Sequence, residues 1–353
     1  MRMTFPLFRI CLSLNTWQAM GESNWAGLRP AAMEELVRSP CVIRATMGAI
    51  GPRGVSNGQP MKSYADIKPP SPQVPLAHAR WVGFNDGPAA MCRLDKEAHL
   101  MRTAIVIPAR YGSSRLPGKP LLRSTGKYLV QHVYERALGS RRARYVIIAT
   151  DDSRIAAAVE SFGGNYVMTR SDHASGTDRV AEVAEHLDVD IIINLQGDEP
   201  EVDVAALDLL PDLLEDDEQA SMATVATPLR TRQQWLDAHC VKVVCDHDGR
   251  ALYFSRSPIP SVRDGEPDFS LRPSPFLQHV GLYAYHREFL LQLAQTPPTP
   301  LEKLEKLEQL RALALGCKIR VGLVANSSCG VDTLSDYQEF VRRYREKSYC
   351  QAA

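Results

Sequence analysis

The segment Ile105–Leu122 reads IVIPARYGSSRLPGKPLL and places an apolar, β-branched run directly before a loop of glycines, serines and cations. Ile105, Val106 and Ile107 predict a strand buried on both faces of a parallel sheet, because successive side chains of a strand point to opposite faces and all three are apolar. Proline has no N–H to donate, so Pro108 is expected to end the hydrogen-bond ladder. The segment therefore predicts a buried strand that delivers a polar loop to the edge of a sheet.

The loop after this strand has the composition of a phosphate-binding site. Glycine lets a backbone approach a ligand closely, short hydroxyls donate hydrogen bonds, and cations neutralise phosphate charge. The residues with these properties are Arg110, Gly112, Ser113, Ser114, Arg115, Gly118 and Lys119. Their spacing matches neither the GxxxxGK[ST] loop nor the GxGxxG dinucleotide loop. From composition, two interpretations stay open: a triphosphate site, and a surface loop with a solvated basic face.

Predicted strands alternate with predicted helices from Thr103 onward. Helices are expected near residues 129–138, 153–162 and 177–186. This alternation predicts βαβ units and an α/β fold, with a twisted, mostly parallel (mixed) sheet flanked by helices. Ligands of such sheets bind outside the carboxyl ends of the strands, so we expect one cleft at that edge. The loops that would form it are residues 108–119, 150–152, 170–178 and 196–200.

Carboxylates follow two of the predicted strands. Asp198 and Glu199 come after the apolar segment IIINLQ, and Asp332 lies between the apolar segment IRVGLVAN and a helix expected at 335–344. Mg²⁺ prefers one or two carboxylates together with phosphate and water oxygens, so this pattern beside a phosphate loop is typical of metal-assisted phosphoryl or nucleotidyl transfer. The alternatives are an acidic turn at the first position and a simple helix N-terminal residue at the second.

The composition indicates a globular protein with a distinct N-terminal region. The chain has 353 residues, 44% of them hydrophobic, and its 41 basic and 41 acidic residues give a formal net charge of zero. Neither nucleic acid nor an anionic membrane is therefore expected as the main partner. Residues 1–100 are rich in proline and lack a sustained helix or strand period, so we expect an N-terminal extension without a packed core, which is either disordered or outside the catalytic domain. We expect one catalytic domain at residues 101–353.

Two further patterns in the sequence concern the location of the protein in the cell. No apolar run reaches the roughly 18 residues that a membrane-spanning helix requires, so no stable membrane association is expected. The eight cysteines are scattered and contain no CxxC pair. This usage favours reduced thiols, and we expect a cytoplasmic protein.

Eight segments occur in an order that resembles one enzyme family. They are PARYGSSRLPGKPLL, IATDD, MTRSDHASGTDRVAEV, NLQGDEP, ALYFSRSPIP, QHVGLYAY, PLEKLEKLEQLRAL and GVDT, and the resemblance extends from Arg102 to Arg345. The family is that of the 3-deoxy-D-manno-octulosonate cytidylyltransferases, or CMP-KDO synthetases. It implies a nucleotide-diphospho-sugar transferase-like fold, Mg²⁺ as the cofactor and a homodimer. It also implies that CTP and the acidic sugar KDO are converted to CMP-KDO and diphosphate for lipopolysaccharide biosynthesis.

The resemblance assigns roles to individual residues. The catalytic residues would be Arg115, Lys119 and Asp198. The nucleotide would be bound by Arg110, Gly112, Ser113, Ser114, Arg115, Lys119, Arg170, Asp172, Ser175, Gly176, Thr177 and Gln196. The sugar acid would be bound by Gln196, Arg256, His279, Tyr283, Glu308 and Gln309, and Mg²⁺ by Asp198 and Asp332. An arginine suits the sugar carboxylate, and amide, imidazole and carboxylate groups suit its hydroxyls.

Three of the sugar-site residues also have structural interpretations. Tyr283 lies in the alternating apolar segment HVGLYAY, where a core tyrosine is common. His279 could be a hydrogen-bonded structural histidine. Glu308 could lie on the solvated face of one helix that carries leucines at 301, 304, 307, 310 and 313.

Two functional alternatives stay open beside the main prediction. One is a cytidylyltransferase for a related sugar acid, and the other is a non-catalytic nucleotide-binding module of the same fold. The presence of Arg115, Lys119, Asp198 and Asp332 argues against loss of the chemistry. The segment NSSC before GVDT differs from the proline- and glycine-bearing turn of the family, which affects the loop before Asp332.

Overall fold

Four parallel strands form the half of the sheet that carries the predicted cleft. The computed structural model describes Ile67 and residues 101–113, 115–325 and 330–352. The central strand β1 (Thr103–Ala109) pairs in parallel with β2 (Ala143–Thr150) and with β4 (Ile191–Asn194). On the far side of β2, β3 (Tyr166–Met168) adds a further parallel strand. The expected extension at residues 1–100, apart from Ile67, lies outside the described residues.

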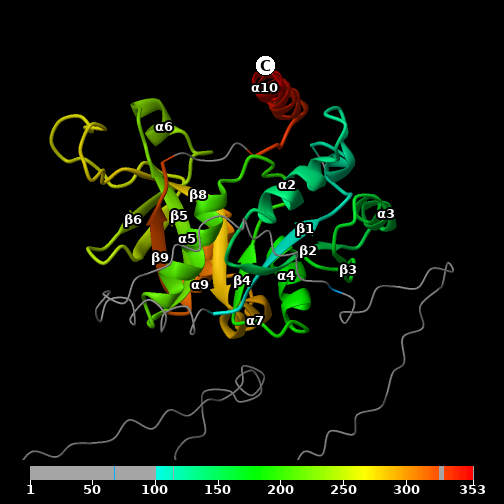
Figure 1. Ribbon diagram of the computed structural model, residues 1–353. Coiled ribbons are helices and arrows are strands. Elements are labelled where there is room, and N and C mark those ends of the chain that lie inside the picture. Colours follow the sequence, from blue (N-terminus) through cyan, green and yellow to red (C-terminus); the bar gives the residue numbers. More distant parts are fainter. Residues whose placement is uncertain (1–66, 68–100, 114, 326–329, 353) are drawn as a thin grey trace, which may run out of the picture. The chain divides into compact units, whose positions relative to one another are not determined.

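The other half of the sheet is mixed. The long strand β8 (Leu277–His286) runs antiparallel to both β4 and β5 (Ala220–Pro228), and β5 pairs in parallel with β9 (Lys318–Leu323). The strand order is β3-β2-β1-β4-β8-β5-β9, and a hairpin of β6 (Lys242–Cys245) and β7 (Ala251–Ser255) joins at β8. The predicted α/β fold with a mixed, largely parallel sheet is confirmed (Figure 1).

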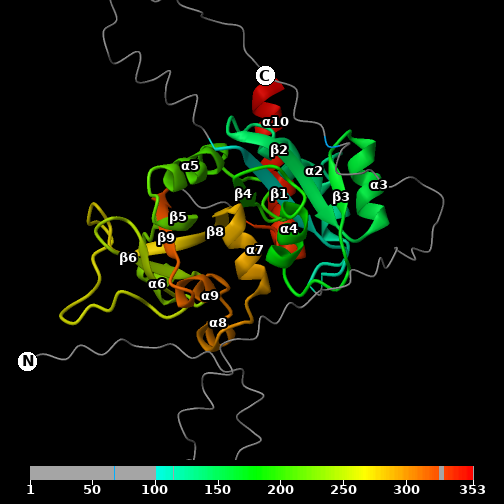
Figure 2. The same ribbon diagram turned by 90° about the horizontal axis from the view of Figure 1, so that it is seen from below.

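Helices cover both faces of the sheet, as Figure 2 shows. One face carries α2 (Leu129–Ala137), α3 (Ser153–Ser161) and α5 (Val204–Glu215); the other carries α4 (Gly176–Ala184), α7 (Arg287–Gln295) and α9 (Gln309–Ala314). Ile105 and Ile107 pack into the first apolar layer, whereas Ala104 and Val106 pack into the second. The prediction that this strand is buried on both faces is therefore confirmed.

The expectation that Pro108 ends the ladder is correct on one side of β1 only. Pairing with β4 stops at Val106, but pairing with β2 continues through Pro108 to Ala109. Successive residues of a parallel strand direct their backbone groups to alternate neighbours, so a missing N–H affects one neighbour and not the other. The ladder between β1 and β4 therefore ends at Val106, and the polar loops follow.

The single helix expected across the leucines at 301–313 is wrong. The segment forms two short helices, α8 (Pro300–Glu305) and α9, separated by residues 306–308, of which Lys306 has φ 55° and ψ 47°. This left-handed conformation breaks the helical period. Leu304 is consequently 80% exposed, whereas Leu307 and Leu310 are buried. After the break, Glu308 contacts the N-terminus of α4.

The C-terminal helix α10 (Leu334–Ala352) packs against the loop that follows β1. Its Tyr337, Phe340 and Val341 form a small apolar cluster with Leu116 and Leu129. Between those last two residues, Lys119–Leu121 forms the 3₁₀ turn η4. A last short helix, α6 (Arg232–Leu236), precedes β6. Within the described part of the chain, no helix combines the length and apolar character that crossing a bilayer requires.

The packing predicts that shortening two apolar side chains will lower the free energy of unfolding by unequal amounts. Ile148 in β2 is fully buried, so Ile148→Ala should lower the free energy of unfolding by about 3 kcal/mol. Leu304→Ala should change it by less than about 0.5 kcal/mol, because that side chain is 80% exposed. Urea denaturation of both variants measures the difference, and equal costs would contradict the two-helix description of residues 300–314.

Candidate active site

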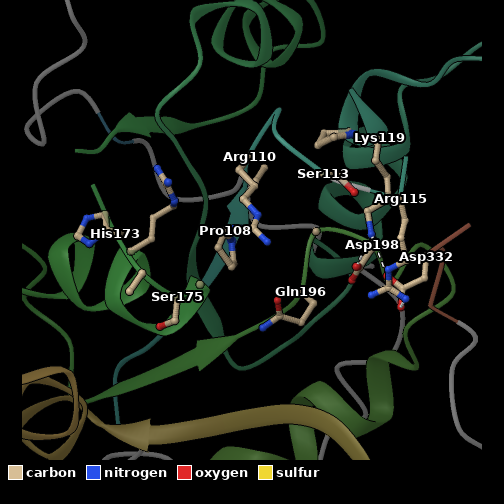
Figure 3. Close-up of a pocket in the computed structure, with 16 residues that line it drawn as sticks. Pro108, Arg110, Ser113, Arg115, Lys119, His173, Ser175, Gln196, Asp198 and Asp332 are labelled. Atoms are coloured by element: carbon tan, nitrogen blue, oxygen red, sulfur yellow. Dashed lines mark hydrogen bonds and ion pairs between the residues drawn. The ribbon is translucent and has the colours of Figure 1, made fainter. Parts of the chain in front are cut away.

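A cavity lies beyond the carboxyl ends of β1 and β4, next to the N-terminus of α4 (Figure 3). Its lining includes Arg110, Ser113, Arg115, Lys119, Ser175, Gly176, Gln196, Asp198 and Asp332. The predicted convergence is thus confirmed for the loops at 108–119, 170–178 and 196–200. The loop at 150–152 does not line the cavity. Its Asp151 accepts a hydrogen bond from Arg179, which does line it.

The cationic loop is folded back on itself around Tyr111. The carbonyl oxygen of Tyr111 accepts hydrogen bonds from the backbone N–H of Ser113 and of Gly118, both at 3.0 Å. Gly118 has φ +68°, and a Cβ there would come within 3.1 Å of the Tyr111 ring, so a side chain would be strained. The guanidinium carbon of Arg154 lies over the Tyr111 ring, 3.4 Å from its centroid, and Asp152 forms an ion pair with Arg154. The loop is therefore preformed.

Lys119 connects the loop to both predicted metal ligands. Its Nζ lies 2.6 Å from Oδ2 of Asp198, 3.3 Å from Oδ1 of Asp332 and 2.8 Å from the carbonyl oxygen of Val331. Arg115 approaches the other oxygen of Asp332, with Nη1 at 3.4 Å. Two carboxylates from distant segments thus converge on one positive charge. Such an all-oxygen donor pair, open to the cavity, fits a magnesium ion that keeps water or phosphate as its other ligands.

Close backbone contact at Gly197 brings Asp198 to this position. A Cβ on Gly197 would lie 2.8 Å from the carbonyl oxygen of Pro108, a distance that real side chains do not adopt. Only glycine therefore lets the end of β4 pass so near to β1. The backbone oxygen of Asp198 in turn accepts a hydrogen bond from the N–H of Val331 at 2.8 Å, which fixes the segment carrying Asp332.

The N-terminus of α4 forms the opposite wall. Ser175 caps the helix reciprocally: its hydroxyl accepts from the N–H of Asp178 at 3.1 Å, and the Asp178 carboxylate accepts from the N–H of Ser175 at 3.0 Å. Other first-turn N–H groups of a helix point outward and favour negative charge. Gly176 lies against Pro108, and a Cβ there would be 3.4 Å from the proline ring.

Several predicted nucleotide residues do not line this cavity. Arg170 and Asp172 line a neighbouring groove between α4 and α7. Gly112 is absent from the lining, and Thr177 is buried and points to Glu308 instead. Ser114 and the segment 326–329 lie outside the described residues.

Two residues with ionisable side chains that the sequence analysis did not single out also line the cavity. Arg179 is 5% exposed and donates hydrogen bonds to Oγ1 of Thr169 and, at 3.1 Å, to Oδ2 of Asp151. It thereby joins the ends of β2 and β3 to α4. His173 contributes from the loop before α4 and pairs with Glu182. The available signal in the sequence was the position of Arg179 directly after the SGTD segment, which was already expected at the site. An arginine buried there needs polar partners, so it could have been expected to join neighbouring loops.

The predicted sugar-acid residues form a second group that does not line the cavity. The rings of His279 and Tyr283 lie 5.4 Å apart, and the Tyr283 hydroxyl donates to Oε1 of Gln309 at 3.3 Å. Arg256 is held by the carbonyl oxygens of Glu305 at 2.7 Å and Ala238 at 3.0 Å. Gln196 lines the cavity itself.

His279 and Gln309 differ in how their polar atoms are satisfied. His279 is buried, its Nε2 lies 2.9 Å from the Thr224 hydroxyl, and burial lowers its pKa to about 3. The ring is therefore neutral at pH 7 and has a structural partner. Gln309 is 3% exposed, and its Nε2 has no hydrogen-bond partner among the described residues. A buried donor without a partner is costly, and a ligand oxygen would satisfy it.

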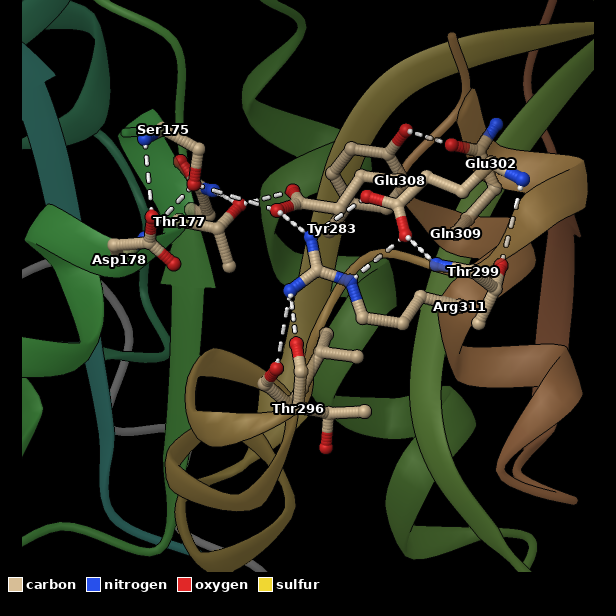
Figure 4. Close-up of polar contacts among 12 residues, drawn as sticks. Ser175, Thr177, Asp178, Tyr283, Thr296, Thr299, Glu302, Glu308, Gln309 and Arg311 are labelled. Carbon is tan, nitrogen blue, oxygen red and sulfur yellow. Dashed lines mark hydrogen bonds and ion pairs between the residues drawn. The ribbon is translucent and has the colours of Figure 1, made fainter. Parts of the chain in front are cut away.

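Glu308 occupies a half-buried polar network (Figure 4), so the interpretation of a solvated helix face is wrong. Its carboxylate accepts hydrogen bonds from Thr177, from Ser175 at 3.3 Å and from Arg311 at 3.1 Å. Burial raises the pKa of Glu308, and the contacts with Thr177 and Arg311 oppose that rise. Arg311 also binds both carboxylate oxygens of Glu302, at 2.9 and 2.7 Å. The network fixes the turn that carries Glu308 and Gln309.

Known proteins are similar to this chain in both sequence and fold. A protein family described as cytidylyltransferase matches residues 104–319. The 3-deoxy-manno-octulosonate cytidylyltransferase of Rhodopirellula baltica is 50% identical over 246 residues, which are 69% of this chain and 98% of that protein. The enzyme of the same name from Geotalea daltonii is 49% identical over 252 residues, 70% of this chain and 100% of that protein.

A solved structure agrees with these relatives. The structure of a CMP:2-keto-3-deoxy-manno-octonic acid synthetase complexed with CTP matches with a TM-score of 0.66 and 44% sequence identity. The match covers 70% of this chain and 99% of that one.

The close approach at Gly197 predicts that an added methyl group displaces Asp198. Gly197→Ala should lower the melting temperature by several degrees and reduce turnover, because the carbonyl of Pro108 is a backbone atom that cannot rotate away. Gly281→Ala is the matched control, since a Cβ there meets nothing within 4 Å. Thermal unfolding and activity assays of the pair decide the point, and an unaffected Gly197→Ala protein would refute the constraint.

Proposed function

This chain belongs to the 3-deoxy-manno-octulosonate cytidylyltransferase family, and we infer that it is the nucleotidyltransferase that converts CTP and 3-deoxy-D-manno-octulosonate to CMP-KDO and diphosphate. The product is an activated sugar acid for lipopolysaccharide biosynthesis. Identity near 50% over the full length of the relatives supports this substrate pair. The observation that carries the proposal is the preformed cavity in which Arg115, Lys119 and two aspartates meet.

The cavity suits a nucleoside triphosphate. Arg110, Arg115 and Lys119 supply positive charge for the phosphates on one wall, and the capped N-terminus of α4 supplies N–H groups that can donate to acceptor atoms of the base and ribose on the other. When a nucleoside triphosphate binds between these walls, its oxygen atoms exchange hydrogen bonds with water for hydrogen bonds with protein donors that are already in place. In this proposal, the base and ribose lie toward Ser175 and Gly176, and the phosphates lie toward Lys119.

Asp198 and Asp332 are the residues that would hold Mg²⁺. When bound there, the ion would neutralise phosphate oxygens and hold them in the reactive orientation. Lys119 lies between the same carboxylates and would keep its positive charge next to the departing diphosphate.

The reaction we propose is a direct displacement. The anomeric hydroxyl oxygen of the sugar acid forms a bond to the α-phosphorus of CTP, the bond from that phosphorus to the bridging oxygen breaks, and the hydroxyl proton passes to solvent. No residue needs to form a covalent intermediate. Lys119 and the arginines stabilise charge on the leaving diphosphate, and the rate comes from positioning and electrostatics.

The second polar group supplies the sugar-acid site. Arg256 would bind the sugar carboxylate, while Glu308, Tyr283 and the unpaired Nε2 of Gln309 would bind hydroxyls. Burial raises the pKa of Tyr283, so its hydroxyl stays protonated. His279 is neutral and can only complete the wall or share a hydrogen bond. A homodimer in the cytoplasm is part of the same proposal.

Diphosphate release tests the assignment. The full-length protein should release diphosphate from CTP only when KDO and Mg²⁺ are both present. Turnover with ATP, GTP or a related sugar acid should be far weaker, because buried polar groups would be left unmatched. Equal turnover with another sugar acid would instead support the related-substrate alternative, and binding of CTP without any turnover would support a non-catalytic module.

The two aspartates should act together. Asp198→Asn and Asp332→Asn keep the shape and remove the charge, so each should lower kcat by roughly 10²-fold or more. The double variant should cost less than the product of the single effects, because groups that serve one metal are not independent. Steady-state kinetics over a range of Mg²⁺ concentration measures this. Full activity of either variant, or of wild type in excess chelator, would contradict the metal assignment.

Arg256→Ala should affect the sugar acid more than the nucleotide. Loss of a charge-assisted contact costs about 1.5 to 3 kcal/mol, which corresponds to roughly 10- to 150-fold in KM for KDO, with little change in KM for CTP. Arg272→Ala is a suitable control, because that exposed arginine donates only to carbonyl oxygens of its own loop. A selective rise in KM for CTP would assign Arg256 to the nucleotide.

A further inference from the structure

A fully buried amide in β4 joins the cavity to the network around Glu308. Asn194 is 0% exposed. Its Oδ1 accepts a hydrogen bond from Nε2 of Gln196 at 3.1 Å, and its Nδ2 donates to Oγ1 of Thr177 at 3.3 Å. Thr177 then donates to Oε2 of Glu308. These four residues form one chain of hydrogen bonds from the cavity wall to the sugar-acid side.

The charge of Glu308 fixes the direction of this chain. An ionised carboxylate only accepts hydrogen bonds, so the single hydroxyl proton of Thr177 must point to it. The Thr177 oxygen must therefore accept from its other neighbours, which are Asn194 and the hydroxyl of Tyr285. Burial keeps the pKa of Tyr285 well above its ordinary value, so that phenol is protonated and can donate.

The fixed direction continues through Asn194 to the cavity. Because its Nδ2 faces Thr177, its Oδ1 must face Gln196, and Gln196 must turn its NH₂ group inward. The Oε1 of Gln196 is then left toward the cavity, 3.7 Å from the position that a Cβ on Gly176 would take. Figure 3 shows the oxygen of Gln196 on the side of Pro108 and Arg110.

We propose that Asn194 is a positioning residue which, with Thr177, transmits the charge of Glu308 to Gln196 and thereby presents the Gln196 carbonyl oxygen to the bound nucleotide. The chain of residues Gln196, Asn194, Thr177 and Glu308 is called the amide relay below. It rests on the proposed function in taking the occupant of the cavity to be CTP. Through the relay, a residue outside the nucleotide cavity decides whether that cavity offers an acceptor or a donor at Gln196.

Arg311 makes the relay switchable by one substitution. Its Nη2 and the hydroxyl of Ser175 both donate to Oε1 of Glu308, while Thr177 donates to Oε2 (Figure 4). In Glu308→Gln, the single carbonyl oxygen should stay with the guanidinium, because Arg311 cannot face an NH₂ group. The new NH₂ then faces Thr177, whose proton turns to Asn194. Because the protonated phenol of Tyr285 already donates to Thr177, we expect the proton to turn to Asn194 and not to Tyr285. Asn194 and Gln196 would then each flip, and the cavity would receive an NH₂ group instead of an oxygen.

The experiment compares Glu308→Gln with a matched control. Glu305→Gln changes the same residue type three positions away, but Glu305 binds Ser255 and the N–H of Arg256 and lies outside the relay. Affinity for CTP is measured by calorimetry without the sugar acid. The Glu308→Gln protein should bind CTP about fivefold or more weakly, as expected for one lost hydrogen bond, and Glu305→Gln should bind it as wild type does.

Breaking the relay in the middle supplies a second comparison. Thr177→Val removes the hydroxyl at nearly constant shape, so adding Glu308→Gln to it should weaken CTP binding no further. Thr177→Ser keeps a hydroxyl and should restore the dependence on Glu308. Additive effects of Thr177→Val and Glu308→Gln would show that the two residues act separately and would overturn the relay.

A spectroscopic readout tests the relay without any ligand. In the full chain labelled with ¹⁵N-glutamine, the side-chain NH₂ signals of Gln196 are identified by their loss in Gln196→Leu. They should shift in Glu308→Gln and stay unchanged in Glu305→Gln. Unchanged signals in Glu308→Gln, or wild-type CTP affinity in that variant, would overturn the proposal. A wild-type protein that bound no CTP would refute the proposed function instead, while the NMR comparison would still decide the relay.

Discussion

One ammonium group, that of Lys119, joins three segments that are far apart in the chain. It contacts the carboxylate after β4, the carbonyl oxygen of Val331 and the carboxylate of Asp332. Two carboxylates this close repel each other, and a partly buried cation between them removes that cost. The loop after β1, the end of β4 and the segment before α10 therefore depend on one another. Substrate phosphates would meet a surface whose charges are already balanced and placed.

The two polar centres use charge in different ways. The cavity side has partly exposed cations and carboxylates, with the Asp332 side chain 51% exposed, so its interactions are screened and can be exchanged for those of a ligand. Around Arg311 the groups are buried, and each ion is held by several hydrogen bonds. Such a network is rigid, because removing one partner leaves another unpaired. In the proposed function, the exposed and exchangeable charges would meet the phosphates, and the buried network would hold the shape of the sugar-acid side.

Much of the fold and of the cavity could be predicted from the sequence, because both depend on local patterns. The apolar runs located β1, β2 and β4, and the rule for strand ends placed Asp198 beside the cationic loop. The break at Lys306 could not be predicted, because the leucine spacing continues through it and no glycine marks the left-handed residue. Arg179 was missed since its partners Thr169 and Asp151 come from other strands, and only the folded chain brings them together.

The packing of α10 on the cationic loop has a consequence for synthesis of the protein. The loop begins near residue 110, but Val331, Asp332 and the aromatic side chains of α10 that hold it in place lie more than 200 positions later. Contacts between such distant segments form late, after the intervening chain has been made and folded. During synthesis, β1, β2 and β4 can pair while the cationic loop still lacks these contacts. The loop is therefore completed only after Val331, Asp332 and α10 have been made.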